Sequence, residues 1–250
     1  MADDDFAEVP ASRGFAERVA GVASLAEPQR RALYRFVVEQ DRPVSKDEAA
    51  AAMGVPRSVA AFHLDRLVAD GLLTTEYRRL SGRRGPGAGR PAKLYRRAEG
   101  ELSVSLPDRR YDLAARLLAG AVDEANRTGA PVARALTRIA TERGRRLGQR
   151  ARALAGKRPS RRALVDAALS VLDEQGYEPR VDGAEVVLAN CPFDALVDEQ
   201  RDLVCGMNHD VLSGMATAVG DDVLTARLEP SDSSCCVRFA AGGGPRAKDR

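Results

Sequence analysis

Residues 45–71 constrain the fold more than any other part of the chain. Ser45 followed three residues later by Glu48 is a capping box, which predicts a helix from about residue 46 through the alanines to Met53. Gly54-Val55-Pro56 ends that helix and starts another, which lasts to about residue 70. Two helices joined by a three-residue glycine turn predict a helix-turn-helix.

The flanking residues extend this unit. Upstream, the pattern predicts a short amphipathic helix around Phe15, Val19 and Val22, and another after Pro28. Downstream, residues 72–79 and 93–97 are predicted strands around a Gly/Pro/Arg loop, 81–91, which is typical of a wing. We therefore expect a winged helix-turn-helix domain over residues 14–100.

The second helix of the motif has an apolar face and an unusual outer face. Alanine and leucine define the inner face, whereas Phe62 points away from it together with Ser58 and Arg66. In a major groove, Phe62 would touch a thymine methyl while Arg57 or Arg66 donates to guanine or phosphate. Packing of Phe62 against the wing or the first helix is the alternative, and His63 is expected to be structural.

Positive charge gathers on the wing. Residues 78–97 carry eight Arg or Lys and no acid, whereas 181–234 carry eleven acids against two arginines. Glycines in the loop let the backbone approach a sugar-phosphate edge, and the cations would contact phosphates or the minor groove. The wing residues expected to contact DNA are Arg83, Arg84, Arg90 and Lys93.

The sequence over residues 28–97 resembles a known family of repressors. Gly54-Val55-Pro56-Arg57-Ser58-Val59, Phe62-His63-Leu64-Asp65-Arg66-Leu67 and the wing segment Gly89-Arg90-Pro91-Ala92-Lys93-Leu94-Tyr95 look like the winged helix-turn-helix of ArsR-like and SufR-like bacterial repressors. The resemblance implies a two-fold dimer on a double-stranded DNA operator.

Beyond residue 107 the pattern changes to long helices and a small sheet. Helices are predicted over 110–155, split at Thr128-Gly129, then over 160–175 and over 193–218 with a break near Arg201. A hairpin around Asp182-Gly183-Ala184 and strands at 223–229 and 235–239 complete an antiparallel sheet. The fold class is α+β, with a helical dimerisation region at 108–176, a sensor domain at 177–240, and disordered tails at 1–13 and 241–250.

Four cysteines lie within the sensor domain, and none precedes residue 191. Cys191 precedes Pro192, so its sulfur is expected at a helix N-terminus, where the helix dipole favours a thiolate. Cys205 lies in the next helical segment with His209 on the same face, and the two could ligate one metal. Cys235 and Cys236 point to opposite faces if they lie on a strand, but reach one centre if the strand begins after them. No pair has the spacing of a zinc knuckle.

This geometry leaves two metal-binding hypotheses, an iron-sulfur cluster on three or four thiolates or a zinc ion on two or three thiolates with His209. Cys191-Pro192-Phe193, Leu203-Val204-Cys205 and Leu228-Glu229-Pro230 before Cys235 resemble the C-terminal region of SufR-like repressors, which implies a cluster, with 4Fe-4S favoured. The resemblance leads us to expect a further cysteine between 206 and 234, and this chain has none. Cys236, His209, Asp194 and Asp198 therefore remain candidates for the fourth ligand.

We expect a cytoplasmic, homodimeric transcription regulator, most simply a repressor, whose operator affinity depends on that cluster. Zinc, structural or sensed, and an organic ligand at the same cysteines are the alternatives. An enzyme with Cys191 as nucleophile is disfavoured because neither histidine is well placed to activate it, and no phosphate-binding loop or HExxH motif occurs. No run of apolar residues is long enough for a membrane helix, and the acidic start is unlike a signal peptide.

Overall fold

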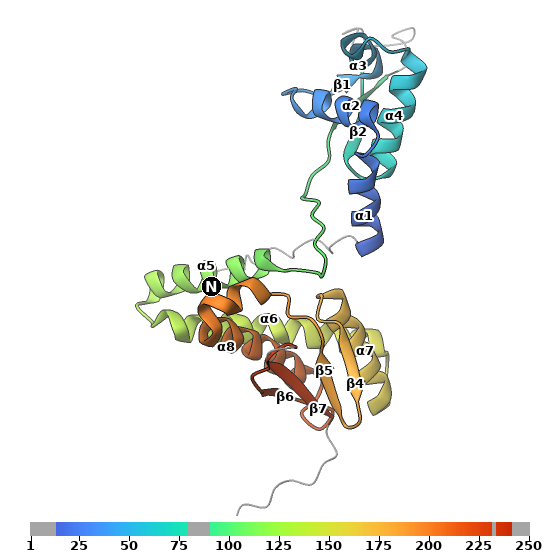
Figure 1. Ribbon diagram of the computed structural model, residues 1–250. Helices are drawn as coiled ribbons and strands as arrows, with labels where there is room; N and C mark the ends of the chain where they lie inside the picture. The colour runs from blue at the N-terminus through green and yellow to red at the C-terminus, as the bar shows by residue number, and fades with distance from the viewer. Residues whose placement is uncertain (1–13, 80–90, 232–233, 242–250) are drawn as a thin grey trace, which may run out of the picture. The chain divides into compact units, whose positions relative to one another are not determined.

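The computed structural model describes residues 14–79, 91–231 and 234–241. The chain divides into two compact units, with the boundary between Val104 and Ser105 (Figure 1). The boundary falls between the expected end of the winged domain at 100 and the expected start of the helical region at 108. Each unit has its own hydrophobic core. Helices and small antiparallel sheets occur in both, as the α+β prediction requires.

The first unit has the predicted helices and wing strands, and one further strand. Its elements are α1 (Phe15–Ser24), α2 (Pro28–Val38), β1 (Val44–Ser45), α3 (Lys46–Met53), α4 (Arg57–Ala69), β2 (Leu73–Arg78) and β3 (Ala92–Arg97). The strands form an antiparallel sheet in the order β1-β3-β2. Strand β1 was not predicted, because two residues are too few to show a sequence pattern.

Local interactions explain the helix-turn-helix. In the capping box, Glu48 N–H donates to Ser45 Oγ at 3.2 Å and Ser45 N–H donates to Glu48 Oε2 at 2.8 Å. Gly54 ends α3 at φ +63°, a left-handed conformation that glycine adopts without strain. The inner face of α4 is buried as predicted, at Ala60, Leu64 and Leu67.

The second unit packs helices against a four-stranded sheet. Its elements are α5 (Tyr111–Thr128), α6 (Val132–Ala155), α7 (Arg161–Glu174), β4 (Pro179–Asp182), β5 (Glu185–Leu188), α8 (Asp194–Val219), β6 (Leu224–Leu228) and β7 (Val237–Ala241). The strands are antiparallel in the order β4-β5-β7-β6. Within the described residues, no helix is both long enough and apolar enough to cross a membrane.

One expected boundary is absent from this unit. The sequence suggests separate regions at 108–176 and 177–240, but one core runs from Leu113 of α5 to Phe239 of β7. The physical reason is that α6 and α8 pack backbone to backbone through glycines at positions 144, 148 and 214. The helical region and the cysteine-bearing region therefore share one hydrophobic core.

Two local predictions in this unit concern the segments that carry the cysteines. Helix α8 departs from helical geometry at Gln200, beside the break expected near Arg201. Strand β7 begins at Val237 rather than at 235, so Cys235 and Cys236 lie in the loop that precedes it. Of the two sequence alternatives for this pair, the structure has the loop.

Candidate nucleic-acid interface and thiol pocket

The outer face of α4 carries the residues expected to read DNA. Ser58, Phe62 and Arg66 are exposed, as the helical wheel predicted, and Arg57 is exposed at the start of the helix. The Phe62 side chain is 65% exposed, and its ring meets the His63 ring edge-on with centroids 5.3 Å apart. A large apolar side chain this exposed on an otherwise polar face is available to a partner.

Among the residues expected to contact DNA, each cation that the structure describes has a carboxylate partner. Arg57 donates to Asp47 of α3, Arg66 Nε lies 2.9 Å from Asp70 Oδ2, and Lys93 Nζ lies 2.6 Å from Asp65 Oδ1. At least one side chain of each pair is more than half exposed, so each pair is screened by water and exchangeable. A phosphate would compete with these carboxylates for the cations. The ion pairs were not predicted, because their partners come from other elements or from the turn after α4.

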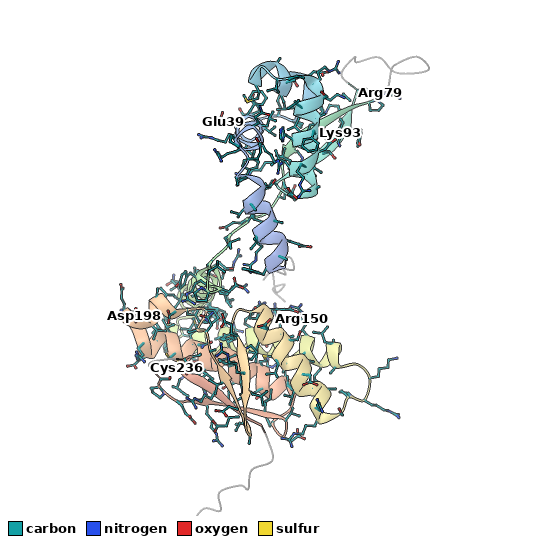
Figure 2. The ribbon with its side chains drawn as sticks, turned by 45° about the vertical axis from the view of Figure 1, so that its right-hand side comes forward. Glu39, Arg79, Lys93, Arg150, Asp198 and Cys236 are labelled. Atoms are coloured by element: carbon teal, nitrogen blue, oxygen red, sulfur yellow. The ribbon has the colours of Figure 1, made fainter. Side chains whose placement is uncertain are left out.

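Asp65 joins α4 to the wing strand β3. Its Oδ1 also accepts a hydrogen bond of 2.8 Å from the hydroxyl of Tyr95, which follows Lys93 on the same strand. Burial alone raises the pKa of Asp65, but the hydrogen bonds from Lys93 and Tyr95 outweigh it and hold the pKa below its usual value. Figure 2 shows Lys93 on β3 and Arg79 directly after the end of β2. Arg83, Arg84 and Arg90, the loop residues expected to contact DNA, lie outside the described residues.

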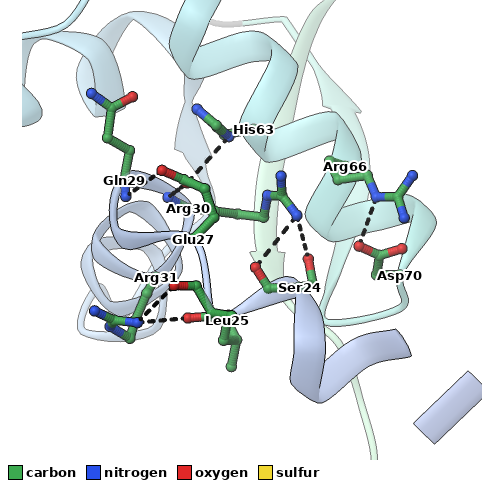
Figure 3. Close-up of polar contacts among 10 residues, drawn as sticks. Ser24, Leu25, Glu27, Gln29, Arg30, Arg31, His63, Arg66 and Asp70 are labelled. Atoms are coloured by element: carbon green, nitrogen blue, oxygen red, sulfur yellow. Dashed lines mark hydrogen bonds and ion pairs between the residues drawn. The ribbon is translucent and has the colours of Figure 1, made fainter. Parts of the chain in front are cut away.

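His63 has the structural position expected for it. The side chain is 11% exposed, and Nδ1 lies 3.6 Å from Glu27 Oε2 (Figure 3). Glu27 is the N-cap of α2 and accepts from the backbone N–H groups of Gln29 and Arg30. His63 therefore packs against the start of α2 and is turned away from the exposed face of α4.

The second unit contains a polar pocket of about 340 Å³ lined by all four cysteines. Cys191 comes from the loop between β5 and α8, Cys205 from α8, and Cys235 and Cys236 from the loop before β7. The other residues of its lining that carry charge are Arg109, Asp194, Asp198 and Arg201. Figure 2 shows Asp198 and Cys236 on the same side of this unit. The Cys191 loop, helix α8 that follows it and the distant loop before β7 thus all contribute cysteines to one pocket.

The four thiols influence one another's pKa values through neighbouring pairs. Cys191 bonds with Cys235, Cys235 with Cys236, and Cys236 with Cys205. The hydrogen bond from Cys235 lowers the pKa of Cys191, and the Phe193 backbone N–H lowers it further. A backbone donor at the start of α8 is what the helix N-terminus predicted for this sulfur.

The pKa values of the remaining thiols are shifted in different directions. The hydrogen bond from Cys235 lowers the pKa of Cys236 to about 6, against burial, which raises it. Burial raises the pKa of Cys205 to about 12, and the bonds to Cys191 and Cys236 raise the pKa of Cys235. The pKa values of Cys191 and Cys236 are thus lowered and those of Cys205 and Cys235 raised, and the single S–H of Cys235 donates to one neighbour at a time.

The structure does not bring every predicted ligand into the pocket. His209 is not among the lining residues, and its Nε2 lies 3.2 Å from Ser213 Oγ one turn further along α8. Asp194 and Asp198, the carboxylate candidates, do line it. Within the described parts of the chain, no three His, Cys, Asp or Glu side chains are placed so that together they could hold a metal ion.

Sequence reasoning missed two residues of this site. Asn208, fully buried on α8, donates from Nδ2 to Cys235 Sγ at 3.2 Å and accepts from the Tyr177 hydroxyl at 2.6 Å. Arg109 contributes a guanidinium from the segment before α5. No local pattern marks either residue, because each acts on a segment at least 27 residues away in sequence.

Comparison with known families supports the first unit. A family model described as a helix-turn-helix domain matches residues 25–76, which include α2, α3, α4 and most of β2. No curated protein matches the chain at a significant level. The matched region is less than half of the chain and ends before the thiol pocket. The chain thus carries a helix-turn-helix domain of the type found in DNA-binding transcription regulators.

Proposed function

We propose that this protein is a homodimeric transcription regulator whose affinity for a double-stranded DNA operator is controlled by an iron-sulfur cluster at Cys191, Cys205, Cys235 and Cys236. One observation carries the proposal: four thiols from two loops and helix α8 line one pocket, in a chain whose other unit has a helix-turn-helix. Repression is the simplest direction of control, because a bound dimer blocks access to its operator.

The exposed face of α4 supports the DNA-binding half. Phe62 supplies an apolar contact for a thymine methyl, Arg66 supplies a guanidinium donor beside it, and Arg57 supplies another at the start of the helix. Lys93 lies on a wing strand beside them, held to α4 through Asp65. These residues give one helix for the major groove and one wing for the phosphate backbone.

The pocket fits a cluster in donor type and number. Iron-sulfur clusters are held by cysteine thiolates, commonly four. The pocket has four thiols, and the pKa values of two of them are lowered. Arg109 and Arg201 offer positive charge beside them. When bound, a cluster would supply a centre that oxidants, nitric oxide or iron shortage can remove. Four thiolates also suit zinc, which is the second candidate at the same residues.

Exposed apolar side chains on the two long helices support a dimer. Val122 of α5 is 48% exposed, and Val132 and Leu154 at the ends of α6 are 45% and 57% exposed. A second copy of the chain would cover such residues in a two-fold interface. Dimerisation would also place two helix-turn-helix units on two half-sites.

Anaerobic purification followed by iron, zinc and sulfide analysis and a visible spectrum tests the proposal. We expect a coloured protein with broad visible absorption and a cluster-dependent change in binding to a duplex that the wild-type protein selects from a random-sequence pool. Each of C191S, C205S and C235S should lose the absorption. H209A is the matched control and should keep it, because His209 does not line the pocket.

Three results decide between the candidates. Zinc at one equivalent without iron or sulfide would replace the cluster by the zinc hypothesis. A colourless, metal-free protein that binds the duplex equally well would remove both metal hypotheses. Loss of absorption in H209A alone would move the site away from the pocket.

A further inference from the structure

The segment that connects the two units is fastened to the Cys191 loop by several hydrogen bonds. Arg110 N–H donates to the Pro192 carbonyl at 2.9 Å, and Asn190 Nδ2 donates to the Asp108 carbonyl at 2.9 Å. Residues 108–110 follow closely after the boundary at Ser105. The chain that leads to the helix-turn-helix is therefore anchored beside a cysteine of the pocket.

The guanidinium of Arg109 is the centre of this attachment. Nη1 donates to Asn190 Oδ1 at 2.5 Å and to the Cys191 carbonyl at 3.3 Å, and Nη2 lies 3.1 Å from Asp194 Oδ2. The side chain is 19% exposed. A planar fork of donors holds all three acceptors at once, which the single ammonium of a lysine cannot reproduce.

The three acceptors belong to Cys191 itself and to residues close to it in the sequence. Asn190 precedes it, Cys191 contributes its own carbonyl, and Asp194 is the first residue of α8. Any shift of the Cys191 backbone therefore displaces acceptors of the Arg109 fork. Asn190 itself is buried, and its Nδ2 also donates to the Gly176 carbonyl, which ties it to the residues after α7.

We infer that Arg109 couples the state of the thiol pocket to the segment leading into the helix-turn-helix unit. This inference rests on the proposed function, because it assigns a route by which a group bound at Cys191 alters DNA binding. Ligation at Cys191 repositions the loop, the Arg109 fork gains or loses acceptors, and the order of residues 105–110 changes with it. Arg109 is a positioning residue, since its contacts are with the loop that carries a ligand.

Two variants separate this role from a charge effect in the pocket. R109K keeps the positive charge and removes the fork. R201Q removes a positive charge from the same pocket and leaves the attachment intact, because the acceptors of the fork belong to Asn190, Cys191 and Asp194. Full-length protein is used, metal-free or reconstituted anaerobically with Fe²⁺ and sulfide.

The first readout is amide hydrogen exchange in metal-free protein. R109K should speed exchange at Arg110 by about tenfold, the factor expected for loss of roughly 1.4 kcal/mol of hydrogen bonding, while R201Q stays like wild type. The second readout is the ratio of duplex affinities of reconstituted and metal-free protein. R109K should bring this ratio close to one. R227Q, at an exposed arginine of β6 that does not line the pocket, should keep the wild-type ratio.

The outcomes are distinct. An R109K protein with faster exchange but an unchanged affinity ratio overturns the coupling and leaves the proposed function standing. Unchanged exchange in R109K shows that the fork does not order the segment, which also overturns it. If wild-type protein takes up no iron or has a ratio of one, the proposed function fails first and the coupling falls with it.

Discussion

Gly144 of α6 lies so close to Val211 of α8 that a Cβ atom on the glycine would sit 1.7 Å from the Val211 carbonyl oxygen. No side-chain rotation relieves that overlap, because the neighbouring atom is backbone. The reverse contact is equally close, since a Cβ on Gly214 would lie 2.1 Å from the Thr141 carbonyl oxygen. The two helices that carry the core of the second unit therefore touch through their backbones.

Substitution G144A should destabilise the second unit by about 3 kcal/mol or more, because α6 and α8 must separate to admit one methyl group. Urea unfolding followed by circular dichroism measures the loss. G206A is the matched control on α8, where an added Cβ meets no atom within 4 Å. It should stabilise the protein by roughly 0.5 to 1 kcal/mol through helix propensity. Equal effects of the two variants would contradict the close packing.

Removal of the Asn208 side chain should destabilise the core and disturb Cys235 together. N208A leaves the Tyr177 hydroxyl without its partner in a buried site, which costs about 1 to 3 kcal/mol in addition to the cavity. Y177F removes the hydroxyl instead, so the double variant should lose less than the sum of the two single losses. Urea unfolding of all four proteins gives the comparison, and strict additivity would show that the bond is not formed.

The capping box makes a contribution to folding stability that depends on pH, and Glu48 is the group that titrates. The hydrogen bond with Arg42, followed by those with Ser45, lowers the pKa of Glu48 from 4.5 to about 2. A carboxyl with a lowered folded pKa stabilises the folded state above its unfolded pKa, so this contribution is complete above about pH 5 and lost as the pH falls toward 2.

The variant E48Q isolates that contribution, because glutamine keeps the cap but does not titrate. At pH 7 the free energy of unfolding of the wild type should exceed that of E48Q by less than about 1 kcal/mol, since the carboxylate is partly exposed and screened by solvent. Urea midpoints measured from pH 7 to pH 3 should converge. A difference that stays constant across this range would rule out the charged form as its source.

Phe62 should matter for DNA and little for stability. F62A should leave the urea midpoint within about 0.5 kcal/mol of wild type, because the ring is mostly exposed. Affinity for the selected duplex should fall about tenfold, as expected for losing roughly 1.4 kcal/mol of apolar contact. V181A, at a comparably exposed apolar residue of β4, is the control and should bind as wild type does. Unchanged binding by F62A would exclude this side chain from the interface.

Asp47 should oppose DNA binding by holding Arg57. D47N releases the guanidinium and removes a negative charge, so affinity for the duplex should rise a few-fold. The salt dependence should steepen by about 0.9 in log-log slope if the freed arginine gains one phosphate. D166N breaks a similar exposed pair with Arg162 in the second unit and serves as the control. Lower affinity in D47N would place Arg57 outside the interface.

The sequence by itself determined the features that depend on neighbouring residues. Ser45 and Glu48 are three positions apart, so their reciprocal caps form wherever the helix forms, and Gly54 ends that helix through its own backbone freedom. The same local logic gave the exposed position of Phe62 and the break in α8 beside Arg201. All four are decided within one or two helical turns.

Only the tertiary structure decided which side chains meet. Cys205 and His209 share a face by helical spacing, yet His209 lies against Ser213 while Cys205 joins three sulfurs from other segments. Arg109 reaches a loop 81 residues away, a partner that no local pattern specifies. Such contacts follow from the packing of α6 on α8 and from the register of the sheet, which depend on the whole core at once.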